Sequence, residues 1–309
     1  MAEREPRLRI GLMLGGIRTA GEIGQLAAHA EAHGFDSLWA GDHIAFPAPI
    51  LDPLTTLACC AAHTERVALG TCVYLLPLRH PTTVAKSVAS LDVLANGRLI
   101  FGIGVGGEFP AEFEACGVPL SERGARTNEA IRVLRALWGG NTVGFEGRFV
   151  RFAPVKLNPP PMQLGGPPIW IGGRSEAALR RAARLGDGWV GYLLSPDQFR
   201  ERFAQVEAMA AARQRQVVGA MMVFTAPRPT REQALRDAGN VLGAMYGRAM
   251  HSAAERYCLL GSTADIIAGV ERYRAAGVRH LILTPLVFDG AQLREEITML
   301  GDALRSVRE

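Results

Sequence analysis

The sequence predicts a (β/α)8 TIM barrel, and three observations support this fold class. Short apolar segments alternate with amphipathic segments along most of the 309 residues, which is the pattern of βαβ units on a parallel sheet. Eight such apolar segments can be counted, and a helical pattern follows each of them. Several helical patterns end at a glycine suited to a left-handed C-cap. The alternative is a doubly wound open sheet, but such sheets usually have fewer strands and a nucleotide fingerprint in the first turn.

The eight expected strands share a β-rich apolar composition. They are LRIGLML (8–14), SLWAGD (37–42), VALGTCVY (67–74), LIFGIGVG (99–106), PIWIGG (168–173), GWVGYLL (188–194), VVGAMMVFT (217–225) and HLILTP (280–285). The clearest helices between them end at Gly34, Asn96-Gly97 and Gly277. We expect these glycines to adopt positive φ, because glycine has no Cβ to clash there.

Two stretches interrupt this alternation. Residues 139–168, between the fourth helix and the fifth strand, are rich in Gly and Pro, and the alternating VGFEGRFVRF near their start predicts an inserted hairpin followed by an irregular arm. Residues 227–260 predict extra helices after the seventh strand. Neither insertion has the composition of a separate domain, so we expect residues 1–309 to form a single barrel domain.

Composition excludes several classes of protein. The chain is 48% hydrophobic and 21% charged, and its net charge of +4 comes from basic residues spread through helices, which argues against a nucleic-acid partner. Five cysteines without CxxC spacing predict neither disulfides nor a zinc site. The N-terminal MAEREP lacks the apolar core of a signal peptide, and no run of about 18 apolar residues occurs. We therefore expect a cytoplasmic protein without a membrane partner.

The residues that end the strands carry the functional signal, because a barrel places its active site at the C-terminal ends of its strands. Asp42 and His43 follow the second strand, Cys72 lies in the third and Glu108 follows the fourth. Histidine titrates nearest neutral pH, and a neighbouring carboxylate can fix its tautomer, so His43 is the first candidate for an acid/base. The alternative is that Asp42 caps a turn and His43 is a solvated loop residue.

Two glycine-containing turns are candidate cofactor sites. GIGVGG fits G-x-G-x-x-G through Gly102, Gly104 and Gly107, but no helix starts directly after it, so packing or close approach of a flat ligand explains it equally well. In IWIGGRSEAALRRAARLG a strand ends at residues 172–173 and a helix begins near Ser175, which leaves free backbone N–H groups beside Arg174. This turn is a candidate phosphate cradle; a capped helix with an exposed arginine is the alternative.

Metal and Schiff-base chemistry have no sequence support. No H-x-H ends the first strand and no HExxH occurs, so we expect no metal. Lys86 and Lys156 lie in a helix and in the insertion, away from any strand end.

Three long segments carry a resemblance to a known family. GFDSLWAGDHIAFP, the stretch from RVALGTCVYLLPLRHP to RVLRALW, and PPIWIGGRSEAALRRAARLGDGWVGY resemble the bacterial luciferase-like superfamily, in particular its oxidoreductases that depend on the deazaflavin coenzyme F420. The similarity covers nearly the whole chain, including LLGSTADIIAGVERYRAAGVRHLIL. It is specific to the family and much less specific to a substrate.

The resemblance implies how a cofactor is held. It implies a flavin or deazaflavin at the C-terminal mouth and a non-prolyl cis peptide in the third strand, for which the matching bond is Cys72-Val73. The residues that it places at the cofactor ring and phosphate are Cys72, Val73, Gly104, Val105, Gly106, Gly172, Gly173, Arg174 and Ser175.

The resemblance also implies roles in catalysis. Asp42 and His43 match the acidic-histidine pair of the F420 branch, with the histidine placed to exchange a proton with the substrate. Glu108 matches an acid of some relatives but is offset by the extra Gly107. Of the basic residues that bind a sugar phosphate in one relative, only Arg256 has a match, so that substrate is not expected.

The resulting expectation is hydride transfer between F420 and a small hydrophobic substrate, with His43 as acid/base. Because relatives are often dimers, we also expect a homodimer. Phe46 and Tyr192, together with Trp39 and Leu76, are expected as apolar walls of the substrate pocket. One alternative is an FMN-dependent monooxygenase of the same superfamily that uses oxygen. A non-catalytic flavin-binding relative and an unrelated barrel lyase or isomerase are the others.

Overall fold

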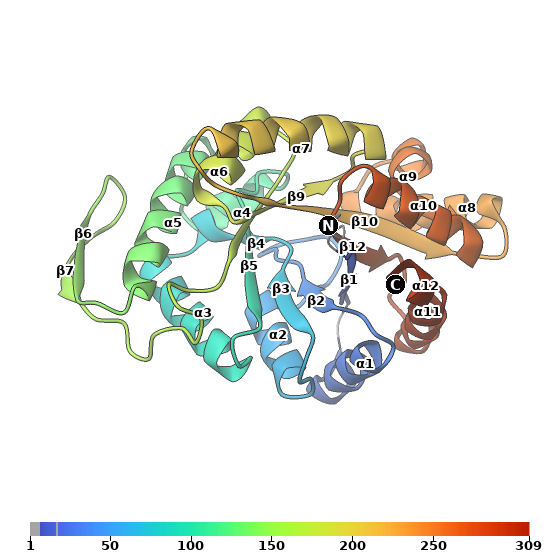
Figure 1. Ribbon diagram of the computed structural model, residues 1–309, viewed down its shortest axis with the longest axis horizontal. Coiled ribbons are helices and arrows are strands. Elements are labelled where there is room, and N and C mark those ends of the chain that lie inside the picture. Colours follow the sequence, from blue (N-terminus) through green and yellow to red (C-terminus); the bar gives the residue numbers. More distant parts are fainter. Residues whose placement is uncertain (1–6, 17, 309) are drawn as a thin grey trace, which may run out of the picture.

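The computed structural model describes residues 7–16 and 18–308, and its centre is a closed ring of parallel strands (Figure 1). The ring strands, in chain order, are β1 (Arg9–Met13), β2 (Ser37–Ala40), β3 (Ala68–Thr71), β5 (Leu99–Gly104), β8 (Ile169–Gly172), β9 (Gly188–Tyr192), β10 (Val218–Pro227) and β12 (His280–Pro285). Each pairs in parallel with the next, β12 pairs with β1, and β9 pairs with β10. The closed (β/α)8 barrel is thereby confirmed, and the open sheet is excluded.

Helices surround the ring in Figure 1. They are α1 (Ala20–Ala32), α2 (Pro53–Ala61), α3 (Pro81–Leu94), α4 (Pro110–Ala115), α5 (Arg123–Trp138), α6 (Glu176–Leu185), α7 (Pro196–Ala211), α8 (Arg231–Tyr246), α9 (His251–Tyr257), α10 (Thr263–Ala275), α11 (Gly290–Ala303) and α12 (Arg305–Arg308). Gly34, Gly97 and Gly277 follow α1, α3 and α10 with φ of 80°, 73° and 97°, which confirms the expected left-handed caps.

The interruptions lie where the composition changes. The antiparallel hairpin of β6 (Val143–Glu146) and β7 (Arg151–Val155) projects from the side of the barrel between α5 and β8 (Figure 1). After β10, α8 and α9 precede β11 (Leu259–Gly261), which pairs with the far end of β10. The predicted third strand is divided into β3 and β4 (Tyr74–Leu75), with short 3-10 turns at Leu76–Leu78 and later at Leu120–Glu122.

The interior of the barrel is filled by side chains at its N-terminal end, which we call the floor. Trp39 and Trp170 pack 5.3 Å apart between ring centroids, and the ring of His280 meets both edge-on. Ser37 Oγ lies 2.7 Å from His280 Nε2 and accepts a hydrogen bond from Trp39 Nε1 at 2.7 Å. Burial lowers the pKa of His280 to about 3, with a smaller contribution from Arg9, so this imidazole is neutral.

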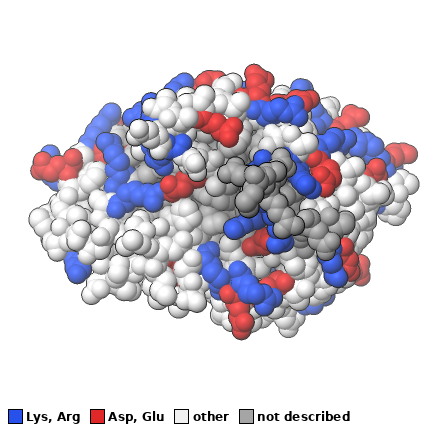
Figure 2. All heavy atoms as spheres, viewed as in Figure 1, with Lys and Arg blue, Asp and Glu red and all other residues white. Residues whose placement is uncertain are grey.

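Acidic and basic side chains lie close to one another around the face shown in Figure 2. No helix within residues 7–16 and 18–308 is long and apolar enough to cross a membrane. Residues 1–6, on which the absence of a signal peptide rests, lie outside the described residues. The cytoplasmic location and the homodimer stay predictions.

Candidate active site

A cavity of about 320 Å³ opens at the C-terminal ends of the strands. Most of the residues expected there line it: Asp42, His43, Phe46, Cys72, Val73, Gly104, Val105, Gly106, Glu108, Gly172, Gly173 and Tyr192. The size falls within the range of about 300–1,000 Å³ that is usual for ligand sites. The structure therefore brings residues from five separate βα units to one mouth, while their functional roles stay predictions.

His43 is held at this mouth by a glutamate that the sequence did not single out. Its Nδ1 lies 3.1 and 3.0 Å from Glu112 Oε1 and Oε2, and Glu112 Oε1 also accepts from the backbone N–H groups of Ile44 and Ala45 at 2.6 and 3.0 Å. The Glu112 side chain is 1% exposed, whereas that of His43 is 21% exposed. The carboxylate is thus buried behind the imidazole, on the side away from solvent.

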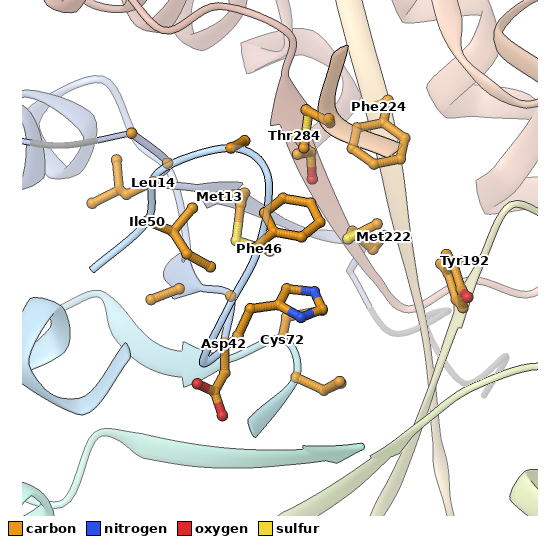
Figure 3. A pocket seen from close by; sticks show the side chains of 18 of the residues that line it. Met13, Leu14, Asp42, Phe46, Ile50, Cys72, Tyr192, Met222, Phe224 and Thr284 are labelled. Atoms are coloured by element: carbon orange, nitrogen blue, oxygen red, sulfur yellow. The ribbon is translucent and has the colours of Figure 1, made fainter. Parts of the chain in front are cut away.

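Asp42 does not face His43, which corrects the expected contact between the two neighbours. Its carboxylate accepts from Leu75 N at 2.8 Å and from both terminal nitrogens of Arg79 at 2.5 and 2.9 Å. In Figure 3 this carboxylate points away from Phe46 and the apolar side chains above it. The reason is that both Asp42 oxygens accept hydrogen bonds from β4 and the segment between β4 and α3, 33 and 37 residues further along the chain.

Glu108 lies at the mouth and is bonded to Tyr192. The Tyr192 hydroxyl donates to Glu108 Oε1 at 2.8 Å, and the Arg174 guanidinium lies over the Tyr192 ring at 5.4 Å. Burial, reinforced by the charge of Glu108, raises the pKa of Tyr192 above its ordinary value. The same two causes raise the pKa of Tyr246 to about 12. Both phenols are neutral hydrogen-bonding groups at physiological pH.

The Cys72-Val73 peptide bond is cis, as the resemblance implies. A Cβ on Gly104 would lie 2.3 Å from Val73 Cγ2, and one on Gly172 would lie 2.4 Å from Val73 Cγ1. These glycines therefore make room for the Val73 side chain, which packs between them. This contact fits the packing interpretation of Gly104, and the residue also lines the cavity, so its expected place beside the cofactor ring stays a prediction.

The candidate phosphate turn lies at the edge of the cavity. Gly172 and Gly173 line it, whereas Arg174 and Ser175 are not among its described lining residues. Ser175 is the N-cap of α6, and its hydroxyl accepts from Ala178 N at 3.3 Å. Gly173 has φ of 117°, which permits the sharp turn from β8 into this helix.

The opposite side of the mouth is apolar. Figure 3 shows Met13, Leu14, Ile50 and Phe46 on one side of the cavity, and Met222 and Phe224 across from them. Val241 and Met245 of α8 add to this lining, so the helices inserted after β10 contribute directly to the cavity.

Two expected wall residues are not part of this lining. Trp39 and Leu76 are both fully buried among the described residues: Trp39 belongs to the floor, and Leu76 packs in the main core. The Trp39 indole N–H donates to Ser37 Oγ, which belongs to the same floor. The expectation that Trp39 and Leu76 line the pocket is wrong.

Within residues 7–16 and 18–308, no group of three His, Cys, Asp or Glu could hold a metal ion.

Comparison with known proteins agrees with this geometry. A model of the luciferase-like monooxygenase family matches residues 7–280. An uncharacterized protein of Mycobacterium tuberculosis is 34% identical over 204 residues, 60% of this chain and 69% of that protein. An F420-dependent glucose-6-phosphate dehydrogenase of Nakamurella multipartita is 34% identical over 183 residues, 55% of this chain and 51% of that enzyme.

Solved structures extend the comparison over nearly the whole chain. Monooxygenase RslO1 from Streptomyces bottropensis superimposes with a TM-score of 0.85 at 25% identity, over 96% of this chain and 98% of its own. An F420-dependent secondary alcohol dehydrogenase shares the fold with a TM-score of 0.86 at 21% identity, over 98% and 100% of the two chains. With the family model covering residues 7–280 and the cis peptide at the expected bond, this chain belongs to the luciferase-like monooxygenase family.

Proposed function

We propose that this chain is an oxidoreductase that transfers a hydride between coenzyme F420 and a small hydrophobic organic substrate, with His43 as the acid/base. The observation that carries the proposal is a single cavity lined by His43, by the cis Cys72-Val73 segment and by the Gly172-Gly173 turn. The relatives named as F420-dependent glucose-6-phosphate dehydrogenases, 34% and 32% identical over about half of this chain, favour the same cofactor.

The chemistry of the lining fits a deazaflavin. A flat apolar ring requires an apolar slot, and Cys72, Val73 and Val105 offer one at the ends of β3 and β5. Burial raises the pKa of the Cys72 thiol to about 12, so this wall carries no charge. A phosphate requires donors and positive charge, which the start of α6 and Arg174 would supply. Bound there, F420 supplies a ring carbon that gives or takes a hydride.

The residues of the chain would then position and protonate the substrate. His43 is the partly exposed imidazole of the cavity and would exchange a proton with the substrate atom next to the reacting carbon. Glu108, with Tyr192 bonded to it, is a second polar contact for a substrate. Asp42 would act indirectly, because its bonds to Leu75 and Arg79 fix the segment that carries the cis peptide.

The lining favours a neutral, apolar substrate over a phosphorylated sugar. Among the described residues that line the cavity, Arg18 alone carries a positive charge, and its guanidinium is bonded to the main-chain oxygens of Gly15 and Phe288. Most of the other side chains that line the cavity are Met, Leu, Ile, Val and Phe, which gain free energy by contact with apolar groups.

An FMN-dependent monooxygenase is the second candidate. It is favoured by the likeness to monooxygenase RslO1 over nearly the whole of both chains. The two candidates use the same cavity and differ in the ring system that enters it.

A cofactor titration separates them. Purified protein is titrated with F420 and, separately, with FMN, and fluorescence quenching reports binding. We expect F420 to bind more tightly and Arg174→Ala to weaken its binding, whereas Arg180→Ala on the exposed face of the same α6 leaves it unchanged. Preferential binding of FMN would overturn the cofactor assignment. Tight F420 binding without hydride transfer to any carbonyl substrate in a screen would indicate a non-catalytic binding protein.

A further inference from the structure

We infer that Glu112 is the positioning residue for His43: it holds the proton of the neutral imidazole on Nδ1 and leaves Nε2 as the nitrogen that exchanges a proton with the substrate. The inference rests on the proposed function for its catalytic consequence, but the tautomer itself is a property of the free protein. Glu112 lies on α4, 69 residues along the chain from His43.

The direction of the hydrogen bond follows from the other partners of Glu112. Its Oε1 already accepts from two backbone N–H groups, those of Ile44 and Ala45. An ionised carboxylate has no proton to donate, so the contact with His43 Nδ1 at 3.0 Å requires the proton to be on Nδ1. In a neutral imidazole only one nitrogen carries a proton, and Nε2 therefore presents its lone pair.

Aromatic contacts keep the ring in this orientation. The imidazole stacks on Phe46 with centroids 4.3 Å apart and an angle of 7°, and Phe109 meets it edge-on at 5.3 Å. Within the described residues Nε2 has no hydrogen-bond partner, while His43 lines the cavity. A ring held at Nδ1 and on one face leaves the Nε2 edge for a ligand.

The consequence concerns where the proton moves. When Nε2 takes a proton from a substrate hydroxyl, the ring becomes an imidazolium whose Nδ1–H still faces the Glu112 carboxylate. In the reverse direction the imidazolium returns its Nε2 proton to the substrate, and the Nδ1 proton stays in place. A carboxylate at Nδ1 stabilises the charged ring in both directions.

Glu112→Gln should reverse the tautomer. The two backbone donors need an acceptor, so the amide oxygen stays with Ile44 and Ala45 and the amide NH₂ faces His43 Nδ1. A donor at that position requires Nδ1 to accept, which moves the ring proton to Nε2. The neutral ring can then no longer take a proton through Nε2, and the imidazolium would place two donors against each other.

The test is nitrogen NMR of the free protein, above the pH at which the imidazole is charged, with the His43 signals identified by their loss in His43→Ala. We expect a protonated Nδ1 in the unmodified protein and a protonated Nε2 in Glu112→Gln. Glu114→Gln, an exposed position on the same helix, is the matched control and should keep the original tautomer. With F420 and a substrate, Glu112→Gln should lower kcat ~100-fold or more, with little change in KM.

An unprotonated Nδ1 in the unmodified protein, or the same tautomer in Glu112→Gln, would overturn the inference. If the variant does not fold, the protonation of Nδ1 in the unmodified protein alone still tests the inference. A reversed tautomer with unchanged kcat would leave Glu112 as the positioning residue and refute His43 as the acid/base, so the two proposals fail separately.

Discussion

Two histidines lie at opposite ends of the same barrel, and the charge of their surroundings differs. His280 contacts neutral groups, whereas His43 contacts a carboxylate. His280, at the floor, is 2% exposed and its Nε2 faces the Ser37 hydroxyl. Trp39 donates to that oxygen, which leaves the serine hydroxyl one proton and one lone pair for the contact with Nε2. His43, at the mouth, has Nδ1 against a carboxylate and must donate.

The comparison shows that the end of the barrel at which a histidine lies determines whether its imidazole can exchange a proton with a ligand. The floor surrounds His280 with tryptophans and a hydroxyl, which favour the neutral ring and leave no route to a ligand. The mouth gives His43 a carboxylate behind and a cavity in front. One histidine is structural and the other is suited to proton exchange, although neither carries a distinctive motif.

Replacing the two histidines should give opposite results, and this is the largest effect that we expect. His43→Ala should lower kcat about 10²- to 10⁴-fold, the usual contribution of a general acid or base, while F420 affinity and thermal stability change little. His280→Ala should lower thermal stability and leave kcat of the folded protein within a few-fold. Steady-state kinetics and thermal melts measure both; a normal kcat in His43→Ala would refute its role.

Asp42 offers a test of stability at the mouth itself. Its carboxylate is 1% exposed and binds Arg79 through two bonds, so Asp42→Ala leaves a largely buried guanidinium without its partner. We expect a loss of about 3 kcal/mol in the free energy of unfolding, measured with denaturant. Asp52 also approaches Arg79, at 3.5 Å, but is 45% exposed. Asp52→Asn retains the cap of α2 and should cost less than about 1 kcal/mol. Equal losses would contradict this distinction.

The fold was predictable from the sequence because its signals are local. Alternating strands and helices placed all eight ring strands, and the glycine caps placed helix ends. The strand ends were less accurate: β2 stops at Ala40, two residues before the predicted end. The third strand was predicted as one segment, 67–74, with a cis peptide at Cys72-Val73; the bond is cis, and the structure has two short strands, β3 and β4, on either side of it.

The site was predictable only in part because its contacts are distant in sequence. The rule that strand ends form the mouth located His43, Glu108 and Gly172. No periodicity or spacing connects Glu112 to His43, since the contact depends on how the loop after β2 packs on α4. Adjacency in sequence also misled: Asp42 and His43 point to different partners.

Lowering the pH should destabilise the protein through His280 at the floor. The pKa of His280 is about 3 when folded, below its ordinary value of about 6.5, so the unfolded chain binds this proton more readily. The stability due to the neutral ring is complete above about pH 6.5 and is lost as pH falls toward 3. At pH 5 the loss amounts to about 2 kcal/mol. His280→Gln, which does not titrate, should unfold with a shallower dependence on pH between 6.5 and 5. Parallel curves would show that His280 does not titrate as described.

The smallest effect that we expect compares hydroxyl groups at the two ends. At the floor, the Ser37 hydroxyl bonds both His280 and Trp39, so Ser37→Ala leaves two buried groups unpaired and should cost at least about 1 kcal/mol. At the mouth, the buried Thr284 Oγ1 has no hydrogen-bond partner within the described chain, although the residue lines the cavity (Figure 3). Thr284→Val removes an unpaired polar atom and should raise the free energy of unfolding by up to about 1 kcal/mol. Denaturant unfolding of both variants measures whether the free energy of unfolding falls in Ser37→Ala and rises in Thr284→Val. A loss of stability in Thr284→Val would mean that this hydroxyl is hydrogen-bonded in the free protein, which would contradict the contrast with Ser37.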